Sequence, residues 1–137
     1  MSTQGNVQIV KALFAALGRG DLQGVLALTD DDVEWVIPGE WPLAGTHHGH
    51  RGLADFFHKA ADRVETSISA PLEFIAQADR VLIVGLSTGK IKATNKAFVD
   101  HFVFAMTLQD GKVTHIREYI DTLALARAAG MAAANLG

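Results

Sequence analysis

The sequence predicts a single α+β domain, because helix-like segments come first, strand-like segments come last, and neither a low-complexity linker nor an internal repeat divides the chain. Its 137 residues are 49% hydrophobic and 20% charged. This length supports one hydrophobic core and is too short for two ordinary domains. We therefore expect one domain over residues 1–137.

Two helices are expected near the N-terminus. Apolar residues recur at helical spacing over residues 7–17, and Gly18 and Gly20 end this pattern. Asp21 can cap a second, short helix, because its side chain can accept a hydrogen bond from the first helical turn. The acidic residues 30–32 that follow are expected to form a solvated turn.

A first strand, a loop and a third helix come next. Residues 33–37 alternate in a strand pattern that places Trp35 and Ile37 on one face. Residues 38–52 are rich in Gly and Pro, too long for a simple connection and too apolar for disorder, so we expect a loop of the kind that lines a site. Residues 53–64 then show helical spacing.

The rest of the chain predicts strands. Two candidates cover residues 71–76 and 80–88, and two more flank the tight turn Asp110-Gly111 near the end of the chain. The last pair carries one carboxylate each, Asp100 and Glu118, among large apolar residues. A carboxylate in apolar surroundings must be paired, hydrogen-bonded or protonated, so these two residues are the catalytic candidates.

Both faces of residues 98–108 are rich in apolar residues, whereas a strand buried on one side would carry polar residues on the other. We expect helices or a cavity on one face and a second copy of the chain on the other, which predicts a homodimer through the sheet. The alternative is a larger core within one chain.

Composition limits the classes of partner and of catalytic chemistry that we expect. The net charge is −3 and the basic residues are scattered, so we expect no nucleic-acid partner. The chain has no cysteine, which excludes thiolate nucleophiles and cysteine-ligated zinc. Without a signal peptide or an apolar run long enough to span a membrane, we expect no membrane partner and a cytoplasmic protein.

The histidines His47, His48 and His50 suggest a metal site at first sight. Adjacent loop residues rarely converge on one ion, and no His-x-x-x-His helix accompanies them, so we expect no metal. One of His47 and His48 could instead donate a hydrogen bond into a pocket. His101 and His115 fall at outward positions of their strands.

Several segments are similar to ketosteroid isomerases and SnoaL-like polyketide cyclases of the nuclear transport factor 2-like superfamily. They are residues 15–22, Pro42-Leu43-Ala44-Gly45, residues 94–96, residues 100–104 and residues 117–122. The resemblance covers nearly the whole chain. It implies a cone-shaped α+β barrel, in which three N-terminal helices pack on a curved, mostly antiparallel sheet around a pocket for a small apolar ligand, with no cofactor.

The resemblance also implies roles for both carboxylates. Asp100 falls where the isomerase carries a protonated aspartic acid that donates a hydrogen bond to an oxyanion. Glu118 falls where the cyclases and limonene epoxide hydrolase carry an aspartate acting as general acid or base. The other residues expected to line the pocket are Trp35, Ile37, Glu40, Trp41, His48, Phe56, Phe102, Phe104, Ile116 and Ile120.

The chain departs from those enzymes elsewhere. The isomerase base matches Trp35 or Ile37, its tyrosine matches Leu13, and two charged residues of the epoxide hydrolase match Gly85 and Ser87. The carboxylates Asp100 and Glu118 remain, so we expect an isomerase, cyclase or hydrolase that does carboxylate acid–base chemistry on a small apolar carbonyl-type metabolite. The alternative is a domain of the same fold that only binds a small molecule or dimerises.

Overall fold

The computed structural model describes residues 2–39, 41 and 43–130. Its helices are α1 (Thr3–Gly18), α2 (Leu22–Leu28), α3 (Gly49–Arg63) and α4 (Thr122–Ala128). Its strands are β1 (Thr29–Ile37), β2 (Gly45–His48), β3 (Val64–Gln77), β4 (Arg80–Ile91), β5 (Lys96–Gln109) and β6 (Lys112–Tyr119). The predicted α+β class is confirmed.

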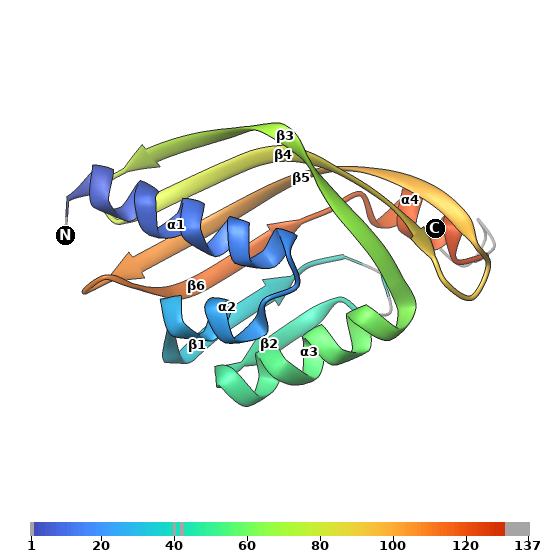
Figure 1. Ribbon diagram of the computed structural model, residues 1–137, viewed down its shortest axis with the longest axis horizontal. Helices are drawn as coiled ribbons and strands as arrows, with labels where there is room; N and C mark the ends of the chain where they lie inside the picture. Colours follow the sequence, from blue (N-terminus) through green and yellow to red (C-terminus); the bar gives the residue numbers. More distant parts are fainter. Residues whose placement is uncertain (1, 40, 42, 131–137) are drawn as a thin grey trace.

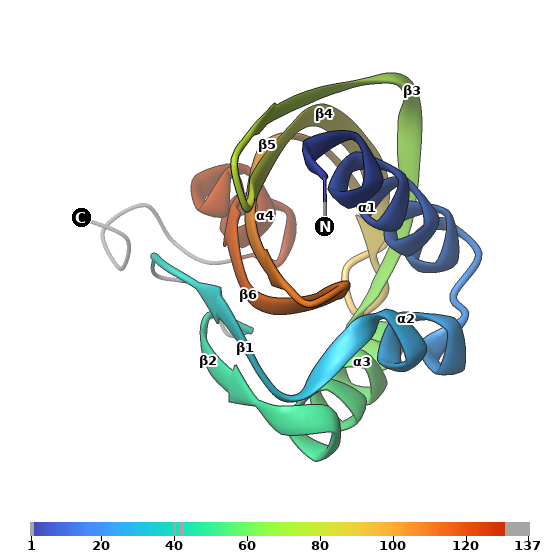
Figure 2. The same cartoon turned by 90° about the vertical axis from the view of Figure 1, so that its left-hand side faces the viewer.

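The strands form one sheet in the order β2-β1-β6-β5-β4-β3, in which only the β1–β6 pair is parallel. The long strands β3 to β6 lie side by side, with α4 at the end of the sheet far from the N-terminus (Figure 1). In the perpendicular view the sheet curls from β3 round to β6, and α1 lies inside the curve (Figure 2). The curved, mostly antiparallel sheet expected from the resemblance is present.

The curvature has a local cause in β3 and β4. The register between these strands shifts within residues 69–73, and such a bulge bends a strand. On the inner face of β4, a Cβ atom at Gly85 would lie 2.7 Å from Cζ of Phe102. At Gly89 a Cβ atom would collide with the backbone carbonyl oxygen of Glu65. Glycine at these two positions lets β3 and the β5 side chains approach β4 closely.

Helix α1 fills one half of the concave face. Ser2 caps it by accepting a hydrogen bond of 2.9 Å from the backbone N–H of Gly5. The Phe14 ring stacks on Phe102 with a centroid separation of 6.1 Å and meets the edge of Phe104 at 5.0 Å. The other half of the concave face lies under α3. The half under α1 is a packed core, and the half under α3 holds a cavity.

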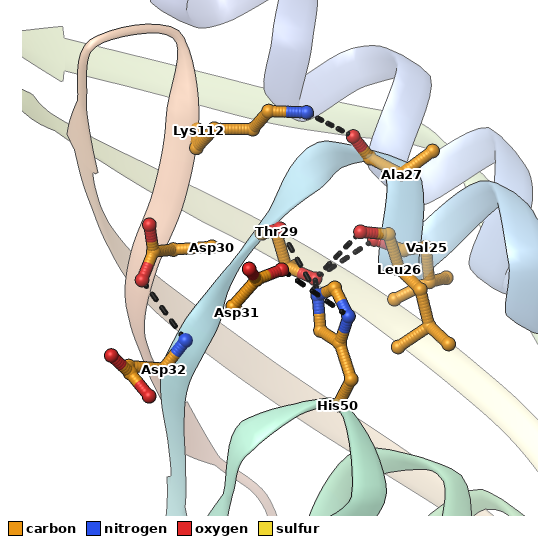
Figure 3. Close-up of polar contacts among 9 residues, drawn as sticks. All are labelled: Val25, Leu26, Ala27, Thr29, Asp30, Asp31, Asp32, His50 and Lys112. Atoms are coloured by element: carbon orange, nitrogen blue, oxygen red, sulfur yellow. Dashed lines mark hydrogen bonds and ion pairs between the residues drawn. The ribbon is translucent and has the colours of Figure 1, made fainter.

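Polar contacts hold the segment where α2 joins β1, and one of them comes from the start of α3 (Figure 3). The Thr29 hydroxyl lies 3.2 Å from the carbonyl oxygens of Val25 and Leu26, which caps the end of α2. Nε2 of His50 lies 3.1 Å from the carbonyl oxygen of Thr29. A carbonyl can only accept, so this nitrogen carries the hydrogen. Lys112 of β6 donates to the carbonyl oxygen of Ala27 at 2.6 Å, which ties the sheet to the same segment.

All three predicted helices and the predicted strands are confirmed, but three details were wrong. Residues 30–32 belong to β1 instead of a turn, because the chain stays extended from Thr29, which pairs with Val113 of β6. The expected loop 38–52 contains β2, which pairs with β1, and the start of α3. Helix α4 was not predicted. None of the described helices is both long and apolar enough to cross a membrane.

Candidate functional site

A cavity of about 440 Å³ lies between α3 and the concave face of the sheet. This volume is within the range of small-molecule sites, and most of the lining is apolar, as in such sites. Seven of its lining residues are aromatic: Trp35, Trp41, Phe56, Phe57, Phe98, Phe102 and Phe104. Both catalytic candidates, Asp100 and Glu118, line the same cavity.

Glu118 lies on the inner face of β6, where Phe104 of β5 pairs with it. On its other side β6 pairs in parallel with β1, which brings Trp35 opposite Ile116. This pairing places the Trp35 indole beside Glu118, and Nε1 donates a hydrogen bond of 2.9 Å to Oε1. One carboxyl oxygen is thereby fixed by a rigid, buried donor.

Burial raises the pKa of Glu118 from 4.5 to about 7. The Trp35 hydrogen bond opposes this rise because it stabilises the ionised form, and the negative charge of Asp100 adds to it. A carboxyl group with a pKa near neutral pH can both accept and release a proton under ordinary conditions. Glu118 therefore has the properties of a general acid or base.

Asp100 lies on the inner face of β5 and is 5% exposed. Its Oδ1 accepts a hydrogen bond of 2.6 Å from the backbone N–H of Asp121. The Asp121 carboxylate in turn caps α4 by accepting a hydrogen bond of 3.0 Å from the N–H of Ala124. Asp100 thus connects the cavity wall to the start of α4.

The pKa of Asp100 is also raised, chiefly by burial. The backbone N–H of Asp121 opposes the rise, the charge of the Asp121 carboxylate adds to it, and the neighbouring Ser87 side chain opposes it again. Ser87 is available because it pairs directly with Asp100 across the β4–β5 register. Two neighbours, the Asp121 N–H and Ser87, therefore favour the ionised form of Asp100, whereas Glu118 has one such neighbour, Trp35.

Most residues predicted for the lining are in the lining. Besides the two carboxylates they are Trp35, Ile37, Trp41, Phe56, Phe102, Phe104 and Ile120. Ile116 has the predicted inward parity, but it is 1% exposed and packs in the core instead of facing the cavity. His48 is exposed at the end of β2 and does not line the cavity. Glu40 lies outside the described residues.

Sequence reasoning missed several lining residues. Ser87 and Thr66 supply hydroxyl groups from the inner faces of β4 and β3, and Leu125 of α4 forms part of the wall. Ser87 shares the inward parity of β4 with the buried Val81 and Ile83, a signal that could have identified it. Leu125 could not be found because the helix that carries it was not predicted.

The histidines do not meet at the cavity wall. His47 stacks on Phe56 with a centroid separation of 4.3 Å, and His50 binds Thr29. Within residues 2–39, 41 and 43–130, no three His, Asp or Glu side chains form a group that could hold a metal ion. Asp31, His50 and Thr29 follow one another at 3.8 Å and 3.2 Å, but Nε2 of His50 carries a hydrogen and so cannot act as a base toward the Thr29 hydroxyl. Thr29 is only 2% exposed, so its hydroxyl is out of reach of a substrate.

Residues 10–116 match a family model described as a SnoaL-like domain. A solved nuclear transport factor 2-like protein from Burkholderia xenovorans is 62% identical, with a TM-score of 0.86 over 93% of this chain and 98% of that one. The protein TerC, co-crystallised with polyporic acid, is 30% identical, with a TM-score of 0.83 over 92% of this chain and 98% of that one.

A Xanthomonas campestris protein provisionally named a polyketide cyclase has the same fold. It is 18% identical, with a TM-score of 0.82 over 92% of this chain and 97% of its own. At this level of identity the likeness concerns the fold alone.

Proposed function

The chain belongs to the SnoaL-like family, and from its carboxyl-lined cavity we propose that it is a cofactor-independent enzyme that moves protons on a small apolar carbonyl compound. The single observation that carries the proposal is Glu118, held by Trp35 at 2.9 Å in an apolar cavity, with a pKa raised to about 7. Isomerisation, cyclisation and hydrolysis are the reaction types of this class that such a group can serve.

The chemistry follows from the two carboxyl groups. Ionised Glu118 takes a proton from the carbon next to the carbonyl group. The electron pair of that C–H bond forms a C=C bond, and the π pair of the C=O bond moves onto the oxygen to give an enolate. Asp100 has one oxygen bound by the Asp121 N–H, so its other oxygen, when protonated, can donate a hydrogen bond to the enolate oxygen. Return of the proton from Glu118 to a different atom completes an isomerisation.

The relative TerC supports a ligand-binding role for the cavity, because it was co-crystallised with the organic molecule polyporic acid and is 30% identical to this chain. The provisional cyclase name of the Xanthomonas protein fits the same class of small metabolite. The substrate of this protein is a separate question from the proton-transfer step, which can be tested with a generic carbon acid.

The test is deuterium exchange into 2-tetralone, a bicyclic ketone with acidic protons beside its carbonyl group, followed by proton NMR in deuterated water. The protein should accelerate exchange above the buffer rate, and Glu118→Gln should lower that acceleration by about 10²–10⁴-fold, the usual contribution of general acid–base catalysis. Glu65→Gln, which removes an exposed carboxylate outside the cavity, is the matched control and should exchange at the parent rate. Absence of acceleration, or acceleration that survives Glu118→Gln, would contradict the proposal.

A second candidate function is binding without chemistry. The observation that favours it is the network around Asp100, which gives that residue a sufficient structural reason to exist. The exchange experiment separates the two functions, because a binding protein would protect 2-tetralone from exchange or leave its rate unchanged.

The outer face of the sheet supports a dimer. Three apolar side chains on neighbouring strands are well exposed there: Leu82 at 37%, Val99 at 50% and Tyr119 at 44%. Partly exposed Val84 and Val103 pair directly between β4 and β5, which makes the apolar surface continuous. We propose that a second copy of the chain covers this face. Sedimentation velocity should show a dimer that Val99→Asp dissociates and that Gln8→Asp, on exposed α1 surface, leaves intact.

A further inference from the structure

The cavity carries acidic groups without a matching cation. Asp100 and Glu118 line it, whereas none of the twelve Lys and Arg residues of the chain does, and all twelve lie in the described part. Small-molecule sites for carboxylates or phosphates use Arg or Lys to neutralise the ligand. This cavity has no such group.

Three basic residues close to the cavity in sequence are engaged elsewhere. Arg19 pairs with Asp21 at 3.1 Å, next to the lining residue Gly20. On α3 Lys59 pairs with Asp55 at 3.8 Å, on the exposed side of the helix. Lys92, beyond the end of β4, donates to the carbonyl oxygen of Ala61 at 2.6 Å. These contacts direct the positive charges away from the interior.

His58 is the remaining titratable side chain among the described lining residues. It lies on α3 and is exposed, so water and salt screen its influence on a ligand inside. The two carboxyl groups, in contrast, lie at buried or half-buried positions, where charge interactions are screened much less. The field inside the cavity is therefore negative.

Neutral donors hold both carboxyl groups. An indole N–H binds Glu118 and a backbone N–H binds Asp100, and each leaves the other carboxyl oxygen available. Such oxygens can exchange a proton or a hydrogen bond with an uncharged carbonyl or hydroxyl group. The aromatic walls, formed by Phe56 and Phe57 of α3 and Phe98 of β5 among others, suit a flat ring.

We infer that the cavity selects neutral, ring-containing ligands that bear a carbonyl or hydroxyl group and rejects their carboxylate, sulfate and phosphate counterparts. The inference rests on the proposed function, since it concerns the same site, and it adds the charge class of the substrate. The unpaired negative charge in the cavity repels an anionic ligand, which lowers the affinity of the wrong ligand instead of raising that of the right one.

The test compares three probes with the same bicyclic ring and different charges at pH 8: 2-naphthol, 2-naphthoate and 2-naphthylmethylammonium. Isothermal titration calorimetry should show that 2-naphthol binds and that 2-naphthoate binds at least about 10-fold more weakly, as expected for like charges within several ångströms in a poorly screened site. Tighter binding of the ammonium probe than of 2-naphthol would overturn the inference in favour of a cationic ligand. Equal binding of 2-naphthoate, or no binding of 2-naphthol, would also overturn it.

Variants test whether the cavity carboxyl groups cause the weaker binding of 2-naphthoate. Glu118→Gln and Asp100→Asn should each reduce the gap between 2-naphthol and 2-naphthoate, and Asn at position 100 can still accept the Asp121 hydrogen bond. Asp55→Asn removes a negative charge from the exposed side of α3 and is the matched control, for which the gap should stay at the parent value. Thermal unfolding verifies that each variant is folded, and a gap unaltered in both cavity variants would overturn the inference.

The outcomes separate this inference from the proposed function. Charge selection without deuterium exchange would leave the inference standing and remove the enzymatic proposal. Glu118-dependent exchange together with equal binding of 2-naphthol and 2-naphthoate would remove the inference and leave the enzymatic proposal.

Discussion

The two carboxyl groups of the cavity differ in how they are held. Asp100 is bound by the backbone N–H of Asp121 at the start of α4, pairs with Ser87 across the β4–β5 register, and is 5% exposed. Glu118 is bound by one side chain, that of Trp35. Among the described residues, no hydrogen bond reaches its other carboxyl oxygen. Asp100 thus also connects the cavity wall to α4, whereas the hydrogen bond of Glu118 comes from a neighbouring strand.

This difference teaches that burial alone does not decide the pKa of an acid in a cavity. Burial raises the pKa of both groups. The neighbours decide the rest, because each hydrogen bond to the ionised form restores part of the lost hydration. Variants that remove a carboxyl group or one of its hydrogen-bond partners can therefore increase or abolish the difference between Asp100 and Glu118.

The largest stability effect is expected from Glu118 and depends on pH. Its pKa is 4.5 in a model peptide and about 7 in the folded protein, so the folded protein binds more protons between these values. The protonated form therefore stabilises the folded state. This contribution to the free energy of unfolding is complete below pH 4.5 and is lost as pH rises to about 7, by up to about 3 kcal/mol. Urea unfolding at pH 5 and pH 8 should show this loss in the parent and a smaller one in Glu118→Gln. An equal loss in both proteins would contradict the raised pKa.

The next effect is expected from Asp100 and concerns α4. Asp100→Ala removes the acceptor of the Asp121 N–H and should lower the free energy of unfolding by about 2 kcal/mol, the cost of losing a hydrogen bond to a charged group. Asp100→Asn keeps an acceptor and should cost less. Hydrogen exchange of the α4 amides should accelerate in Asp100→Ala first. If α4 amides exchange at the parent rate, Asp100 does not brace this helix.

The smallest effect is expected from Trp35→Phe, which keeps an aromatic ring and removes the donor to Glu118. The ionised carboxylate loses one stabilising hydrogen bond of about 1 kcal/mol, so the pKa of Glu118 should rise above its parent value. Carbon NMR of labelled glutamate side chains measures this shift. Trp41→Phe removes the other indole of the cavity wall and should leave the Glu118 pKa unaltered. A similar shift in both variants would indicate a general change in the cavity and not the loss of this bond.

Much of this site follows from strand periodicity. Alternation along β5 and β6 places Asp100, Phe102 and Glu118 on the inner face, because a strand turns every second side chain to the same side. The same rule placed Ile116 inside correctly but could not tell core from cavity. That distinction depends on how far α1 and α3 extend over the sheet, which no single strand encodes.

The partners of the two acids were beyond the reach of sequence patterns. The Trp35–Glu118 bond needs the parallel pairing of β1 with β6, two strands that are far apart in the chain. The Asp121–Asp100 bond needs a helix after β6, and the alanine-rich segment that forms α4 shows little contrast between its faces. Long-range pairing and weak periodicity hid the two contacts that distinguish the acids.

Both tryptophans of the chain, Trp35 and Trp41, line the cavity. Tryptophan emission from the protein therefore originates entirely beside the cavity, without a contribution from indoles elsewhere. A molecule that enters the cavity displaces water from around these rings and alters the wavelength and intensity of the emission. The protein thus carries its own optical reporter of occupancy, which allows libraries of non-absorbing compounds to be screened without a label.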